Sequence, residues 1–342
     1  MRKTAIALTS VLLLPGVTAC AHERKPIPVP QVVSSPVIPE KLTPQSAAET
    51  FKGYVASEDV ARASGDERLA LTWTSDGQSE LTAAEFRKAA FTGTAVTRYD
   101  YGTPTFYVPD LNSYPQWFVA AADRTVAGQA GTKQTALLAF IRNGPADRWK
   151  LSLATLLAKG SKLPSVVVDA SGYATPLATF AAAPLIQPRS VPSIQASIAE
   201  DGPQAAATQV MKDGLFTSGF HAQKVANKAA DKKIGLAVDP LFQPTLFPIF
   251  PLKTADGGAF VLYALKRQTV TLTVLPGHTI PVPRNAAYML DTLIMKDQLT
   301  VNETMQFAAA VPPTAKPKAT QAKADVIAAD YAVTSASTQS AG

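Results

Sequence analysis

The first part of the folded chain carries apolar residues at helical spacing. Ala47, Phe51 and Val55 fall on one face of a helix. Thr43 is a good N-cap for that helix, and Pro44 suits its first position because the N–H that proline lacks would be unpaired there. The pattern therefore predicts a helix that begins at Pro44. Similar signals predict helices over Asp66–Trp73 and from the capping residue Thr82 onward, with a turn at Ser75-Asp76-Gly77 between them.

After Thr97 the period of the pattern changes from helical to two. Leu151 and Leu153 alternate with Lys150 and Ser152, as in a strand with one covered face. Alternation of this kind, interrupted by turn residues, is typical of an antiparallel meander. The strands predicted in this part are Tyr99–Pro109, Gln116–Val126, Gln134–Arg142 and Arg148–Leu157.

The same order of elements then repeats. Residues 158–190 are loop-like and rich in Ala, Pro and Ser. A second helical region follows over Val191–Ile234 and is broken at Asp201-Gly202-Pro203. A turn signal at Asp256-Gly257-Gly258 introduces the clearest strand of this part. The predicted strands are Leu246–Lys253, Ala259–Leu275, Gln298–Val311 and Asp325–Val333.

Helices followed by antiparallel strands, twice over, predict an α+β fold with two tandem domains. Their expected bounds are residues 44–180 and 191–333, with a disordered tail over 334–342. A helix group packed on a curved antiparallel sheet resembles the cone of the NTF2-like fold. The alternative is one unrelated α+β domain followed by a β-rich domain.

The first nineteen residues have the composition of a secretory signal peptide. Arg2 and Lys3 give a positive start, Ala5–Leu14 is apolar, and Val17-Thr18-Ala19 precedes Cys20, the single cysteine of the chain. The apolar run is too short to span a membrane, which takes about 20 residues. Val17-Thr18-Ala19-Cys20 resembles a bacterial lipobox, which implies cleavage before Cys20 and lipidation of its thiol. The alternative is a plain secreted protein cut after Ala19.

Residues 20–43 are predicted to be a tether. Five prolines favour an extended, polyproline-like spacer that holds the folded part away from the membrane. Removal of residues 1–19 lowers the formal charge from +6 to +4, and no dense basic run with interleaved aromatic residues occurs. Nucleic acid is therefore not an expected partner. The expected partners are the membrane, through Cys20, and an envelope protein or wall component.

Three segments of the second half strengthen a family resemblance. Thr254–Val261, Thr269–Thr273, and Gln306-Phe307 with Val311-Pro312-Pro313, taken with the lipobox, resemble a family of uncharacterised actinobacterial lipoproteins that carry a domain of unknown function. The resemblance implies a location in the cell envelope, at the outer face of the membrane. It implies no catalytic residues, because none is established for that family.

Recognisable catalytic motifs are absent from the sequence. There is no nucleophile elbow, phosphate-binding loop, dinucleotide fingerprint or zinc-protease motif, and neither a cofactor nor a metal is expected. His221 is the one histidine in a predicted helical region, where a capping or surface role is the usual one. A pair of aspartates that divides acid and base roles is the remaining catalytic hypothesis, with these as the candidates: Asp100, Asp110, Asp123 and Asp239.

Aromatic residues of the first half are the better candidates for a ligand site. A cone-shaped sheet with an aromatic lining would form a small apolar pocket, although core packing is the usual role of such residues. The residues expected to line this pocket are Trp73, Tyr101, Tyr107 and Trp117.

The sequence thus leaves three functions open. The first is a membrane-anchored, non-catalytic binding or scaffold module of the cell envelope. The second is a carrier of a small apolar ligand or lipid in a cone-shaped pocket. The third is an Asp-dependent hydrolase or isomerase.

Overall fold

A computed structural model of the chain describes residues 41–274, 279–295, 297–315 and 320–339. The chain divides into two compact units, Met1–Ile38 and Pro39–Gly342, and all described residues belong to the second. The predicted signal peptide, Cys20 and nearly all of the predicted tether therefore lie outside the described residues.

The helices begin where the sequence places good caps, with one exception. The Thr43 side chain accepts a hydrogen bond from the Ser46 N–H, and the Ser46 hydroxyl accepts one from the Thr43 N–H. The third helix was predicted to begin at Thr82, but it begins at Asp76, because the turn-like Ser75-Asp76-Gly77 forms its N-terminus. The helices are α1 Pro44–Ser64, α2 Glu67–Leu71, α3 Asp76–Thr92, α4 Val191–Asp201 and α5 Ser218–Lys233, with a short 3₁₀ helix η4 Ala287–Met289.

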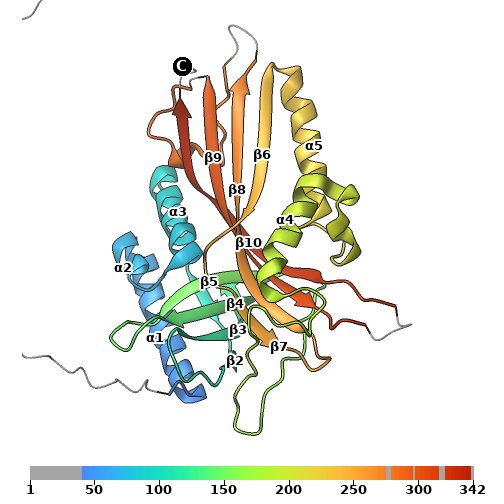
Figure 1. Cartoon of the computed structure of the whole chain (residues 1–342). Helices are drawn as coiled ribbons and strands as arrows, with labels where there is room; N and C mark the ends of the chain where they lie inside the picture. Colours follow the sequence, from blue (N-terminus) through green and yellow to red (C-terminus); the bar gives the residue numbers. More distant parts are fainter. Residues whose placement is uncertain (1–40, 275–278, 296, 316–319, 340–342) are drawn as a thin grey trace, which may run out of the picture. The chain divides into compact units, whose positions relative to one another are not determined.

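All the strands join one antiparallel sheet (Figure 1). Its main order is β1-β3-β4-β5-β10-β9-β8-β6, with β2 paired to β3 and β7 paired to β8. The bounds are β1 Tyr99–Tyr101, β2 Thr105–Tyr107, β3 Gln116–Val126, β4 Gln129–Arg142, β5 Lys150–Leu157, β6 Leu236–Pro244, β7 Phe250–Lys253, β8 Ala259–Thr273, β9 Gln298–Val311 and β10 Asp325–Gln339.

The α+β class is confirmed, whereas two tandem NTF2-like domains are not. Each half contributes a meander, but β5 of the first half pairs with β10 of the second at Leu157↔Ala328 and Leu156↔Ala329. Pairing satisfies the N–H and C=O groups that two separate sheets would leave at open edges. The Gln306 side chain strengthens the junction by accepting a hydrogen bond from the Ala154 N–H over 2.8 Å. Strand patterns in a sequence do not reveal such partners.

Two further expectations about the strands were wrong. Residues 334–339, predicted to be disordered, continue β10 and pair with β9 as far as Gln339↔Gln298; their Ser, Thr and Ala residues follow the strand period on a half-exposed edge. Strand β6 was missed because it contains Pro240 and Pro244. Proline is tolerated there because β6 is the last strand of the sheet order and pairs only with β8.

Helices cover the sheet in separate places and bury separate cores. Helix α1 packs its Phe51 and Tyr54 on Phe118 and Phe140 of the first meander. Helices α4 and α5 lie beside β6 and β8, over a core that includes Phe220 of α5 (Figure 1). Helix α3 contacts β5, β9 and β10, so it spans the junction of the two meanders.

Candidate functional site

The junction of β5 and β10 creates space beside the sheet. The two strands pair over two residues only, so the rest of β10 continues along β9 without a partner on its other side. Helix α3 and η4 lie against this free part of β10. Two cavities of ligand size lie beside the sheet, one between α5 and the second meander and one between α1, α3, the first meander and β10.

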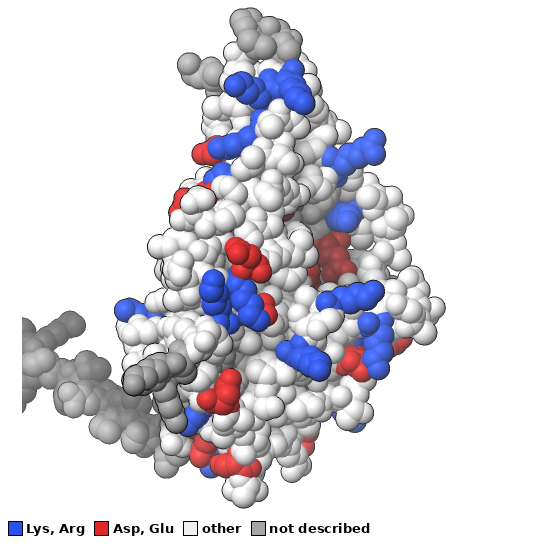
Figure 2. All heavy atoms as spheres, turned by 90° about the vertical axis from the view of Figure 1, so that its right-hand side faces the viewer, with Lys and Arg blue, Asp and Glu red and all other residues white. Residues whose placement is uncertain are grey.

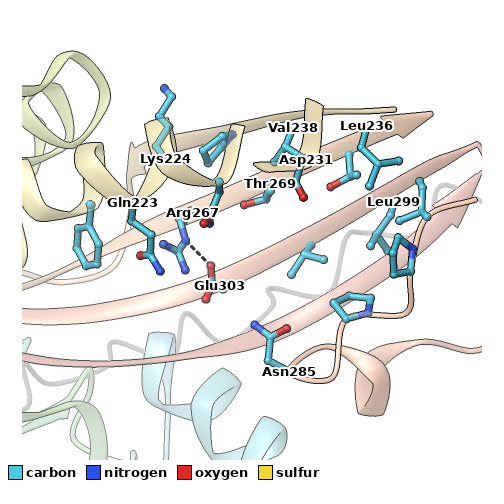
Figure 3. Close-up of a pocket in the computed structure, with 18 of the residues that line it drawn as sticks. Gln223, Lys224, Asp231, Leu236, Val238, Arg267, Thr269, Asn285, Leu299 and Glu303 are labelled. Atoms are coloured by element: carbon cyan, nitrogen blue, oxygen red, sulfur yellow. Dashed lines mark hydrogen bonds and ion pairs between the residues drawn. The ribbon is translucent and has the colours of Figure 1, made fainter. Parts of the chain in front are cut away.

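The first cavity, here called the α5 cavity, has a volume of about 380 Å³. Its walls come from one face of α5 and from alternate residues of β6, β8 and β9, which strand geometry points to the same side (Figure 3). One end includes the apolar Leu236, Val238 and Leu299 with the side chain of Asp231 beside them, whereas Gln223 and Arg267 lie toward the other end (Figure 3). A volume of this size is usual for a small-molecule site.

The cations of the α5 cavity already have partners. Arg267 forms an ion pair with Glu303 inside the cavity (Figure 3), and Lys224 forms one with Glu200 of α4. Burying a neutral polar group without a hydrogen-bond partner costs about 2–7 kcal/mol, and burying an unpaired anion costs more. The polar end of the cavity therefore suits neutral hydrogen-bonding groups, offered by the amides of Gln223, Asn227 and Asn285.

The second cavity, here called the junction cavity, has a volume of about 390 Å³ and is more polar. Asn285 and Glu303 line it as well as the α5 cavity, so the two are neighbours. Charged residues reach it from α1, α3, β3, β9 and β10. They are Glu58, Arg62, Glu85, Lys88, Arg124, Glu303 and Asp330.

Arg62 is the buried centre of one group in the junction cavity. Its guanidinium binds Glu58 at 3.0 Å (Nε to Oε1) and Glu85 at 2.7 Å (Nη1 to Oε1), and it donates to the Thr97 carbonyl at 2.8 Å. Burial alone would lower the pKa of Arg62, but the two glutamates raise it above its ordinary value. Arg62 is thus permanently charged, and its Nε and Nη1 atoms both have partners.

Arg124 and Asp330 form a second group with different properties. The Arg124 guanidinium lies 4.2 Å from the centre of the Tyr99 ring. Across the described ranges, neither Arg124 nor Asp330 takes part in an ion pair. Burial raises the pKa of Asp330 to about 6, although Arg124 opposes the shift. Both charges are therefore available within the cavity.

The raised pKa of Asp330 predicts a pH-dependent effect on stability. An acid whose pKa is higher in the folded protein than in the unfolded chain destabilises the fold when ionised, and this penalty disappears as the pH falls from above 6 to below 4. Asp330→Asn should therefore raise the free energy of unfolding at pH 7.5, by up to about 2–3 kcal/mol. Urea titrations at several pH values measure this; an equal gain at pH 4 and pH 7.5 would contradict it.

The four aromatic residues predicted to line one pocket do not come together. Neighbours along a strand point to opposite faces, so Trp117 packs against Phe250 at 5.5 Å between ring centres, on the face opposite to Phe118. Tyr107 joins the same core as Trp117. Trp73 and Tyr101 pack on the other core, and of the four only Tyr101 lines the junction cavity.

The four aspartates proposed as candidates for an acid pair lie at the surface, and three of them bind separate lysines. Lys133 holds the pKa of Asp123 below its ordinary value, and Lys228 does the same for Asp239. His221 contacts the Glu200 carbonyl through Nδ1 at 2.8 Å, as a structural residue would. Within the described part of the chain, no group of three His, Cys, Asp or Glu could hold a metal ion. The ion pairs are Asp110–Lys41 at 3.1 Å, Asp123–Lys133 at 2.6 Å and Asp239–Lys228 at 2.7 Å, while Asp100 is exposed.

Sequence reasoning missed the charged residues that the cavities contain. Asp123 and Arg124 follow the apolar run Trp117–Ala122, and Asp330 interrupts another over Val326–Val333. A lone charge inside a run that reads as buried is unusual, so a signal was available for Asp330 but not for Arg124. On the face seen in Figure 2, acidic and basic side chains are interspersed, so the charge of this surface does not point to a binding site.

The fold and cavities define an α+β protein with two ligand-sized sites beside one antiparallel sheet. The chain belongs to the family described as Domain of unknown function (DUF8094), which matches residues 39–338. An uncharacterized lipoprotein of Streptomyces coelicolor is 28% identical over 57% of this chain and 56% of its own length. An uncharacterized lipoprotein of Streptomyces avermitilis is 28% identical over 64% of this chain and 63% of its own length. These relatives confirm the predicted resemblance to uncharacterised actinobacterial lipoproteins.

The comparisons cover the relatives only in part. The matches span about half to two thirds of the first two relatives, and a second Streptomyces coelicolor lipoprotein is 25% identical over 77% of this chain and 76% of its own length. No solved structure matches the chain. Among the described residues, no helix has both the length and the apolar character needed to cross a membrane.

Proposed function

We propose that this protein is a lipid-anchored, non-catalytic binding protein at the outer face of the cell membrane, and that the α5 cavity holds a neutral amphiphile. The cavity carries the proposal, because it combines a group of apolar residues at one end with polar residues at the other, and its cations are already paired. Cys20 is the proposed anchor, supported by the lipobox-like Val17–Cys20 and by relatives that are named lipoproteins. The Pro-rich tether is the proposed spacer.

The shape of the cavity supports an amphiphile rather than a wholly apolar ligand. Leu236, Val238 and Leu299 can cover a hydrocarbon segment, which gains about 0.8 kcal/mol for each CH₂ group removed from water. The amides of Gln223 and Asn285 can bind hydroxyl or carbonyl groups at the polar wall. A protein that binds such a ligand would act as the carrier of a small apolar ligand or lipid, which is the second function that the sequence leaves open. An envelope protein or wall component stays a proposed partner for the outer surface.

A blocking substitution tests the α5 cavity. Val238→Trp should fill it and weaken binding of the neutral dye N-phenyl-1-naphthylamine by about tenfold or more, or 1.4 kcal/mol. Ala237→Trp is the matched control, because Ala237 is the exposed neighbour on the opposite face of β6. Dye fluorescence is measured on the full chain carrying Cys20→Ala, without detergent. Equal binding by both tryptophan variants would contradict the proposed site.

Competition for the same dye tests the class of ligand. Monodecanoylglycerol and decanoate have the same chain length, and both are used below their critical micelle concentrations. We expect the neutral glyceride to displace the dye at a concentration at least about tenfold lower than the anion, because Arg267 and Lys224 are already bound to Glu303 and Glu200. Stronger displacement by decanoate would show that these ion pairs open for an anionic ligand. It would contradict the proposal that the ligand is neutral.

A further inference from the structure

We infer that the junction cavity is a second binding site, for a small zwitterion that carries one carboxylate and one ammonium group, as a free aromatic amino acid does. The site is distinct from the α5 cavity and does not depend on the ligand proposed there. The inference rests on Arg124 and Asp330, which bring opposite charges into one cavity without an ion-pair partner in the described part of the chain.

Arg124 is suited to the carboxylate of such a ligand. Arginine presents a planar set of donors that matches a carboxylate in a two-bond arrangement. The Arg124 Cζ lies 4.2 Å from the centre of the Tyr99 ring, and the guanidinium has no ion pair among the described residues. Arg62, by contrast, lies 4.7 Å from the same ring but forms ion pairs with Glu58 and Glu85 and donates to the Thr97 carbonyl through Nε and Nη1. Arg124 is therefore the cation of this group that remains for a ligand.

Asp330 is suited to the ammonium group. It comes from β10 and lines the cavity, and its carboxylate has no ion pair among the described residues. Tyr99, Tyr101 and Tyr288 also line the cavity, and aromatic faces attract ammonium groups and pack against aromatic side chains. These rings favour an amino acid with an aromatic side chain.

The charge balance of the cavity excludes a simple anion or cation as the best ligand. The two glutamates bound to Arg62 leave one net negative charge, Lys88 offsets it, and Arg267 neutralises Glu303 from the neighbouring cavity. Arg124 and Asp330 then balance each other, so a ligand without net charge fits best. The groups that face Asp330 are Glu58 and Arg62 of α1, Glu85 and Lys88 of α3, Tyr99 and Tyr101 of β1, Arg124 of β3, Tyr288 of η4, Glu303 of β9 and Tyr331 of β10.

Three matched probes test the charge requirement. Isothermal titration of the full chain in detergent at pH 7.5 compares L-phenylalanine with 3-phenylpropanoate, which lacks the ammonium group, and 2-phenylethylamine, which lacks the carboxylate. We expect L-phenylalanine to bind at least about tenfold more tightly than either analogue. Equal or tighter binding of either analogue would overturn the inference, as would the absence of L-phenylalanine binding at millimolar concentration.

Two substitutions assign the charges. Arg124→Gln should remove the preference for L-phenylalanine over 2-phenylethylamine, and Asp330→Asn should remove its preference over 3-phenylpropanoate. Asp330→Asn is expected to stabilise the fold, so a loss of binding there cannot be ascribed to unfolding; a thermal melt checks Arg124→Gln. Arg98→Gln, an exposed arginine paired with Asp59, is the control and should leave all three affinities unchanged. Unchanged preferences in both cavity variants would overturn the inference.

The pH dependence gives an independent readout. With the pKa of Asp330 at about 6, roughly a tenth of the protein has the ionised side chain at pH 5. The affinity for L-phenylalanine should therefore fall about tenfold between pH 7.5 and pH 5, and Asp330→Asn should abolish that dependence. Affinity that rises toward pH 5 would instead indicate an anion site and would contradict the zwitterion.

Discussion

Replacing Cys20 with Ala should move nearly all of the protein from the membrane fraction into the soluble fraction. The two acyl chains of a diacylglyceryl group anchor a protein stably, because each buried CH₂ adds about 0.8 kcal/mol and two chains exceed the marginal binding of one. No described helix could span the membrane in their place. Fractionation of cells followed by detection of the chain in pellet and supernatant measures the effect.

The neighbouring His22 provides the control for the anchor. His22→Ala leaves the lipobox-like Val17–Cys20 intact, so that variant should remain in the membrane fraction and incorporate labelled fatty acid. Wild-type protein that takes up no label, or Cys20→Ala protein that stays in the membrane fraction, would contradict lipidation at Cys20.

Phe140→Ala should destabilise the whole folded unit and not only its first half. The Phe140 ring is fully buried and stacks on Phe118 at 4.8 Å between ring centres, so its loss should cost about 3–5 kcal/mol. Because β5 pairs with β10 and α3 contacts strands of both meanders, we expect one unfolding transition. Phe307→Ala, in the core of the second half, should shift that same transition.

An exposed phenylalanine gives the control for this measurement. Phe91 is 56% exposed on α3, so Phe91→Ala should change the free energy of unfolding by about 0.5 kcal/mol or less. Circular dichroism and tryptophan fluorescence follow the transition in urea. Two transitions, of which Phe140→Ala shifts one and Phe307→Ala the other, would show that the halves fold independently.

Local structure could largely be predicted from the sequence because its signals are local. The cap at Thr43 and Pro44 placed the start of α1, and the strand pattern of the sequence placed β9 at Gln298–Val311. The failures have equally local causes. Pro240 masked β6, and Ser75-Asp76-Gly77 read as a turn although it forms the start of α3, where Asp76 has a positive φ of 48°. In each case the tertiary position, an edge strand or a helix end, decided what the residue could do.

Contacts between distant segments could not be predicted in the same way. The pairing of Leu157 with Ala328 joins residues far apart in the sequence, and nothing in either strand pattern specifies it. The junction cavity depends on that pairing, because it forms where β10 continues beyond β5. The aromatic residues that lie close together in the sequence of the first half suggested a single pocket. Alternation along β3 instead sends Trp117 and Phe118 to opposite cores.

Native mass spectrometry of the full chain, extracted from actinobacterial membranes, tests the proposed function most directly. We expect the wild-type protein to carry the lipid modification and, in addition, a non-covalently bound neutral amphiphile that is absent from Val238→Trp. Retention of the same bound molecule by Val238→Trp, or a lipidated wild-type chain that never carries one, would contradict a binding function for the α5 cavity.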